Sequence, residues 1–168
     1  MLEEYAEAVR KGHRLFLSYC WSDFEDGGVW LEELTRTLVE NTVSYWWDQS
    51  HMPQKDLKQF EELLEGILHD GIRQAAFLVA LMRPGYVESG PDAWVRKEWN
   101  QAGEEIERDG RRHRMTRVAV VFGDQPAAGE WMRPDDIPLS VARDEPAADV
   151  AQLLISTVAA AALNTSVL

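Results

Sequence analysis

Residues 15–19 read Leu-Phe-Leu-Ser-Tyr, a compact apolar run of the kind that forms a β-strand buried on both faces. Loop-forming residues follow from Ser22 to Gly28. From Val29 to Glu40 the apolar side chains fall on one side of a helix, and the charged ones fall on the other. The chain therefore begins its regular structure with a buried strand followed by an amphipathic helix.

The same alternation continues along the chain. Further strands are predicted at Val43–Trp47, Ala75–Met82, Arg117–Phe122 and Ile137–Val141. Further helices are predicted from Phe60 to about Gly71, at Trp94–Arg108 and at Ala147–Leu163, with loops at Asp48–Leu57 and Arg83–Ala93. Strands this apolar leave neither face of the sheet suited to exposure to solvent, so helices must cover both faces. We predict an α/β fold, flavodoxin-like and doubly wound, with a mostly parallel five-stranded sheet.

The length of 168 residues fits a single domain. Residues 1–12 form a leader, either a short amphipathic helix that ends at Gly12 or a segment without regular structure, and the domain spans 13–168. The formal net charge of −12 argues against a nucleic-acid partner, because phosphate binding depends on clustered Lys and Arg. The one basic run, Arg111–Arg114, is predicted to be a solvated loop.

Cysteine usage and the N-terminal residues indicate the compartment. Cys20 is the single cysteine, so no internal disulfide can form, and no His or Cys grouping predicts a metal site. Residues 1–11 are acidic where a signal peptide is basic, and no apolar stretch is long enough to cross a bilayer. We expect a cytoplasmic protein with no membrane partner.

The loop after the first strand excludes two common nucleotide-binding classes. Residues 20–28 lack both the dinucleotide-binding glycine fingerprint and the phosphate-loop Lys-Ser/Thr pair. A response-regulator receiver domain would need an Asp at the end of the third strand, where Met82 and Arg83 stand. In sheets of this class, ligands bind beyond the carboxyl ends of the strands near the switch in strand order. The loops after Tyr19, Trp47 and Met82 are therefore where a site is expected.

Four ordered motifs resemble the Toll/interleukin-1 receptor (TIR) domain family. Residues 14–19 with the Trp-Ser-Asp at 21–23 look like its opening strand, and residues 43–48, which end in Trp-Trp-Asp, look like its second strand. Residues 76–81, then Pro84, Tyr86 and Ser89, are similar to its third strand and the segment after it. Trp94 and Glu98 reproduce its Trp-x-x-x-Glu at the start of the next helix. The resemblance covers about residues 14–122.

The resemblance implies an activity and a set of site residues. In NAD-cleaving members the position of Glu98 supplies the catalytic glutamate, and the bacterial type acts in immune or antiphage defence. Substrate contacts are implied for Trp94, Ser18, Tyr19, Trp47 and Asp48. NAD+ would be a substrate rather than a cofactor, no metal is implied, and copies are expected to self-associate through the loop at residues 48–60. Cleavage would give nicotinamide and either ADP-ribose or a cyclic product.

The residues themselves are compatible with that chemistry. Trp94 and Glu98 lie one turn apart on the same face of the predicted helix, so an apolar wall stands beside a carboxylate. Loss of nicotinamide leaves positive character on the ribose, which a carboxylate stabilises, and the departing base needs no second acid because it leaves neutral. The alternative is that Glu98 is a solvated helix residue and that Trp94, Ser18, Tyr19 and Trp47 serve packing.

Two rival functions stay open, and the sequence departs from the family pattern. The chain could be a non-catalytic TIR adaptor that only assembles, or a flavodoxin-like binding domain of another family. Gln54 and Lys55 stand where the family loop often has a glycine, and Val95 replaces a Cys that often follows the Trp. The first departure bears on the family's usual loop conformation and on assembly. The second does not touch the proposed chemistry.

Overall fold

The computed structural model describes residues 15–26, 28–46, 72, 75–108 and 110–165. Its main sheet has five strands in the order β2-β1-β3-β6-β7, and every neighbouring pair is parallel. The strands are β1 (Leu15–Ser18), β2 (Tyr45–Trp46), β3 (Phe77–Met82), β6 (Thr116–Phe122) and β7 (Ile137–Val141). The predicted doubly wound parallel sheet is confirmed. Strand order reverses between β1 and β3, because the chain passes from β1 outward to β2 and then returns to the other side.

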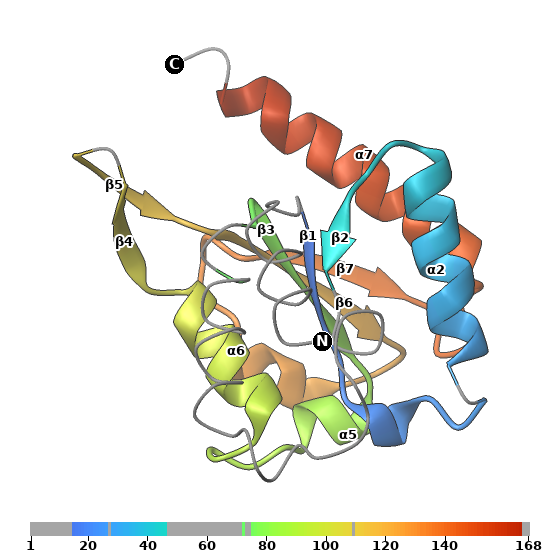
Figure 1. The fold of residues 1–168 in the computed structure, drawn as a ribbon. Coiled ribbons are helices and arrows are strands. Elements are labelled where there is room, and N and C mark those ends of the chain that lie inside the picture. Colours follow the sequence, from blue (N-terminus) through green and yellow to red (C-terminus); the bar gives the residue numbers. More distant parts are fainter. Residues whose placement is uncertain (1–14, 27, 47–71, 73–74, 109, 166–168) are drawn as a thin grey trace, which may run out of the picture.

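Helices cover both faces of this sheet (Figure 1). On one face lie α2 (Val29–Glu40) and α7 (Ala147–Thr165), and on the other lie α5 (Pro84–Val87) and α6 (Trp94–Ala102). The described connections also contain the short 3-10 turns η1 (Trp21–Asp23) and η3 (Pro126–Glu130). The fold therefore has three layers, with the sheet in the middle.

Strand alternation divides the buried side chains into two cores. Leu15 and Leu17 of β1 belong to the core under α2 and α7, whereas Phe16 belongs to the core under α5 and α6. Every side chain of the central strand β3 is buried. Successive residues of a strand point to opposite faces, so Ser18 shares the face of Phe16 and lies on the α5 and α6 side.

The prediction of one helix from Trp94 to Arg108 is wrong beyond Ala102. Residues Glu105–Arg108 instead form β4, which pairs antiparallel with β5 (Arg111–Arg114). The helix ends at Gly103, where a Cβ would come within 2.5 Å of Arg117 Nη1, and Gly110 adopts a φ of +72° between the two strands. A tight turn favours glycine at such a φ, and a hairpin follows.

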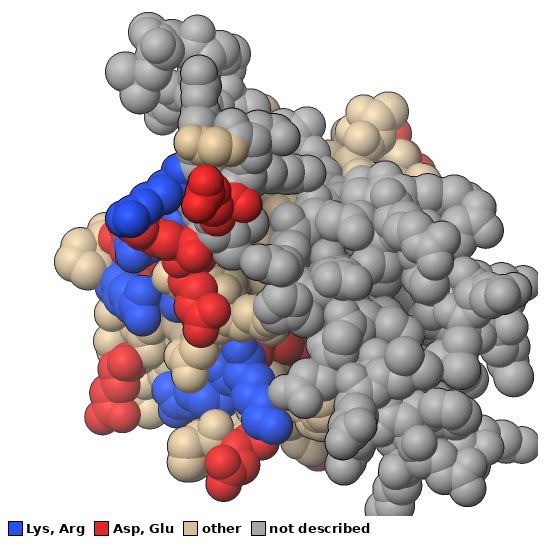
Figure 2. All heavy atoms as spheres, turned by 60° about the vertical axis from the view of Figure 1, so that its left-hand side comes forward, with Lys and Arg blue, Asp and Glu red and all other residues tan. Residues whose placement is uncertain are grey.

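The basic run Arg111–Arg114 is accordingly a strand and not the predicted loop. Its exposed side chains face acids: Arg112 and Arg114 lie 3.7 Å and 4.0 Å from Glu105, and Arg114 lies 2.9 Å from Asp135. Figure 2 shows blue and red side chains interleaved on the described part of this side of the molecule. The run is therefore part of a mixed-charge surface.

Other boundaries agree with the sequence prediction to within a few residues. The bounds of α2 and β7 match, β1 is one residue shorter than predicted, β2 is reduced to two residues, and α7 continues to Thr165. The predicted loop after β3 contains the short helix α5. The leader, the loop at 48–57 and the helix predicted from Phe60 to about Gly71 lie outside the described residues.

Two further observations concern the outer strand β7 and the length of the helices. β7 is the outer strand beyond β6, and it contains Pro138 opposite Ala119. Within the described residues no helix is both long and apolar enough to cross a membrane.

Candidate functional site

The carboxyl ends of β1 and β3 form the rim of the sheet at the point where strand order reverses. β1 ends at Ser18, and β3 ends at Met82, directly before α5. Ligands of doubly wound sheets bind at this position, because the loops after the two strands diverge and leave room between them. The side chains at this rim are therefore the first to consider.

Ser18 connects this rim to α6. Its side chain is only 1% exposed, and its Oγ donates a 2.5 Å hydrogen bond to Oε2 of Glu98. The same Oγ lies 2.9 Å from the phenol oxygen of Tyr86 on α5. The structure thus brings together Ser18 and Glu98, two of the predicted site residues, and adds a third side chain, that of Tyr86, which the prediction did not assign to the site.

Tyr86 is held in place from both ends. Its backbone N–H and that of Gly85 donate to the carboxylate of Asp23, at 2.8 Å and 2.7 Å. A Cβ at Gly85 would lie 2.6 Å from Asp23 Oδ1, so only glycine allows this close approach. The ring of Tyr86 packs against Trp131 at a centroid distance of 5.2 Å. Burial first, and the negative charge of Glu98 second, raise the pKa of the Tyr86 phenol far above its usual value.

Trp94 and Glu98 both lie on α6, one turn apart, as predicted. Trp94 is the first residue of the helix and its side chain is 39% exposed, while Val95 and Trp99 are buried beneath the helix. The ammonium of Lys97 lies 5.0 Å from the centre of the Trp94 ring. Trp94 therefore offers an accessible indole surface beside the half-buried carboxylate of Glu98.

The remaining predicted site residues are placed elsewhere or are not described. The side chain of Tyr19 is 6% exposed and belongs to the core under α2 and α7, where it meets Trp21 and Phe24 edge to face at 5.2 Å and 5.6 Å. It lies on the opposite side of β1 from Ser18 and Glu98. Trp47 and Asp48 lie outside the described residues.

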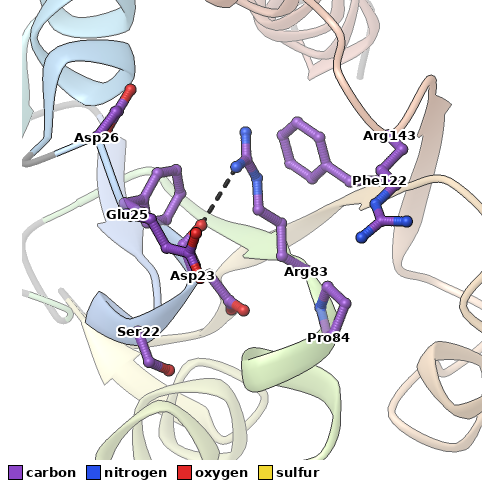
Figure 3. A pocket seen from close by; sticks show the side chains of 9 residues that line it. Ser22, Asp23, Glu25, Asp26, Arg83, Pro84, Phe122 and Arg143 are labelled. Carbon is purple, nitrogen blue, oxygen red and sulfur yellow. Dashed lines mark hydrogen bonds between the residues drawn. The ribbon is translucent and has the colours of Figure 1, made fainter.

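A separate pocket of about 450 Å³ opens on the α2 and α7 side of the same rim. Arg83 lies within it, beside Phe122 (Figure 3). The Arg83 guanidinium is 4.6, 5.0 and 4.5 Å from the ring centres of Phe24, Trp30 and Phe122. Burial lowers the pKa of Arg83, against the nearby charges of Asp23 and Asp26. The lining residues are Ser22, Asp23, Phe24, Glu25, Asp26, Arg83, Pro84, Phe122 and Arg143, and they include neither Ser18 nor Glu98.

Sequence reasoning did not assign Tyr86 or Arg83 to a site. Tyr86 belongs to the motif that resembles the family's third strand and the segment after it. Its place shortly after that strand was the signal that could have assigned it to the rim of the sheet. Arg83 carried no signal, because its aromatic neighbours Phe24, Trp30 and Phe122 all lie far from it along the chain. Among the described residues, no group of three or more His, Cys, Asp or Glu could hold a metal ion.

Comparison with known proteins identifies the family. The family model described as TIR domain matches residues 15–154, which is most of the chain. No curated protein gives a significant match. The match runs from the first residue of β1 into α7, so it includes Ser18, Tyr86, Trp94 and Glu98. This chain belongs to the TIR domain family.

Proposed function

We propose that this TIR domain cleaves NAD+ between ribose and nicotinamide, with Glu98 as the catalytic carboxylate. The observation that carries the proposal is the position of Glu98. Its carboxylate is bonded to Ser18 at the carboxyl end of β1, at the strand-order reversal where this class of fold binds ligands, and an accessible indole lies one turn away.

The chemistry needs one well-placed carboxylate. When the bond between C1′ of the ribose and the nicotinamide nitrogen breaks, its electron pair goes to nicotinamide, which departs neutral. Positive charge then develops on the ribose, and a fixed carboxylate beside it stabilises that charge. Water adds to C1′ and loses a proton, which gives ADP-ribose. If a nucleophilic group of the same molecule reaches C1′ first, the product is cyclic.

The proposal assigns the neighbouring residues as follows. Trp94 provides a flat apolar surface for the substrate, and Ser18 holds the carboxylate. Trp47, Asp48 and Tyr19 remain proposed substrate contacts. The ring of Tyr19 packs on the other side of the sheet, so Tyr19 would contact substrate through its backbone or after its ring has moved. We further propose that activity requires self-association of TIR domains in the cytoplasm, in a bacterial defence response, with NAD+ as substrate and no resident cofactor.

The test is chromatography of NAD+ incubated with the wild-type chain over a wide range of protein concentrations. Nicotinamide release should rise more steeply than protein concentration, because assembly precedes catalysis. Glu98→Gln keeps the side-chain shape and removes the charge, so turnover should fall at least ~100-fold. Glu104→Gln is the matched control: it removes an exposed acid just beyond the same helix and should leave turnover unchanged.

Two results would count against the proposal. Full turnover by a folded Glu98→Gln variant rejects the assignment of Glu98. Absence of nicotinamide release at every concentration, together with self-association of the wild-type chain, would instead favour the non-catalytic adaptor.

A further inference from the structure

We propose that Tyr86 is a positioning residue for Glu98: its phenol donates to Ser18, and Ser18 donates to the carboxylate, so that two hydrogen bonds running in one direction fix the carboxylate at the rim of the sheet. We call the three side chains of Tyr86, Ser18 and Glu98 the hydroxyl relay. The inference rests on the proposed function, since it gives Tyr86 a role in the reaction assigned to Glu98.

The direction of the relay follows from the proton inventory. A carboxylate only accepts, and a hydroxyl has one proton to donate. The proton of Ser18 is used in the 2.5 Å bond to Glu98 Oε2. The 2.9 Å contact between Ser18 and Tyr86 must therefore use the proton of Tyr86. Because burial and the charge of Glu98 raise the pKa of this phenol, it keeps its proton and stays a donor.

The relay joins three segments that are each held rigidly. Ser18 is fixed by pairing of β1 with β3, opposite Ala80. Tyr86 is fixed by the Asp23 carboxylate at its backbone and by Trp131 at its ring. Neither Ser18 nor Tyr86 is accessible to bulk water, so removal of one hydroxyl leaves its neighbour without a ready replacement.

The expected consequence is on turnover rather than on substrate binding. Hydrogen bonds to an ionised acceptor are short and strong, and they hold one carboxylate oxygen in one orientation. With one oxygen held by Ser18, the orientation of the whole carboxylate is fixed. The positive charge that the carboxylate is proposed to stabilise develops only as nicotinamide departs, so correct orientation lowers the energy of the transition state. Loss of the relay should therefore lower kcat and leave KM nearly unchanged.

The experiment compares Tyr86→Phe, Ser18→Ala and the double variant with the full wild-type chain, at a concentration where the wild type is active. Each single variant should lower kcat ~10- to 100-fold with KM within about twofold. The double variant should be little worse than either single one, because both break the same chain of bonds. Thr35→Val is the matched control: it also removes a buried hydroxyl bond, that of Thr35 Oγ1 to the Leu31 carbonyl at 3.0 Å, and should leave kcat unchanged.

Proton NMR provides a second readout that does not depend on turnover. The short Ser18 bond should give a downfield hydroxyl signal in the wild type and in Thr35→Val. The signal should be absent in Ser18→Ala and should move upfield in Tyr86→Phe, where the donor to Ser18 is lost. Circular dichroism identifies a variant that does not fold. If Tyr86→Phe does not fold, the kcat of Ser18→Ala tests the hydroxyl relay at its middle residue.

The outcomes separate the relay from the proposed function. If the wild type cleaves NAD+ and Glu98→Gln does not, a Tyr86→Phe variant with unchanged kcat overturns the positioning role. A raised KM with unchanged kcat overturns it as well. If the wild type releases no nicotinamide, the proposed function fails and the positioning role of Tyr86 in catalysis fails with it, while the NMR signal still decides whether the chain of hydrogen bonds exists.

Discussion

Two arginines, one on each side of the sheet, are accommodated in different ways. Arg117, on the α6 side, is 3% exposed and forms a double hydrogen bond with Asp136, at 2.8 Å and 2.7 Å. Arg83, on the α2 and α7 side, lies among three aromatic rings and reaches only the carbonyl of Asp23, at 3.3 Å. The Arg117 guanidinium is paired with a carboxylate and also contacts the carbonyl and the ring of Trp99, whereas Arg83 is held by several weak contacts.

This difference extends to the two faces as a whole. The α5 and α6 side contains the buried polar groups Ser18, Arg117 and Asp136, whereas on the other side the buried polar side chain of Thr35 bonds within its own helix. Buried polar groups need specific partners, and apolar ones need only volume and contact. The α5 and α6 side, whose buried polar groups need specific partners, is also the side that holds Glu98.

The largest effect is expected from Asp136→Ala. It leaves the Arg117 guanidinium buried without its carboxylate and also removes the acceptor of the Arg133 backbone N–H at 2.7 Å. The free energy of unfolding should fall by about 3–5 kcal/mol, measured by urea denaturation. The double variant Arg117→Met with Asp136→Leu should be less damaging, because it removes both charges. A single variant as stable as the wild type would contradict this account of the α6 side.

A smaller effect is expected from Arg83→Met. The substitution keeps much of the side-chain volume and loses the attraction between the guanidinium and the rings of Phe24, Trp30 and Phe122, so stability should fall by about 1–2 kcal/mol. Arg83→Lys should not restore it fully, since a compact ammonium cannot stack as a flat guanidinium does. The same urea titration measures both. Equal losses for Arg83→Met and Asp136→Ala would remove the contrast between the two sites.

The smallest effect is expected from Asp135→Asn. The Arg114 guanidinium, 2.9 Å away, lowers the pKa of the Asp135 carboxyl, but both groups are in solvent. Water and salt screen such a pair, so the melting temperature should not change measurably. Thermal unfolding at low and high salt checks this. A clear loss at low salt that disappears at high salt would contradict this expectation and show that the Asp135–Arg114 pair stabilises the fold.

How far the sequence predicts this fold depends on the kind of signal. α2 and β7 were predicted to the residue, because helical and strand periodicity report burial on one face. The hairpin of β4 and β5 was missed, because Val95, Trp99, Ala102 and Ile106 continue a helical spacing that Gly103 interrupts in the structure. At the end of the helix, Arg117 from the distant strand β6 occupies the space that a side chain at position 103 would need, a contact that the local sequence does not reveal.

The candidate site divides in the same manner. Ser18 and Glu98 could be named from ordered motifs, and Trp94 from its spacing to Glu98. Tyr86 could not be placed beside Ser18, because 68 residues separate them and only the assembled sheet brings them together. The packing of Tyr19 on the opposite side was within reach of the sequence, since neighbours on a strand point in opposite directions.

Pro138 in the outer strand β7 has a consequence for how molecules of this protein can meet. A strand that joined this edge would need backbone N–H groups from β7, and proline has none to give. Edge prolines of this kind discourage the unlimited edge-to-edge growth that leads to aggregates. Copies that met at this edge would therefore have to contact each other through side chains and loops, and their sheets would stay separate.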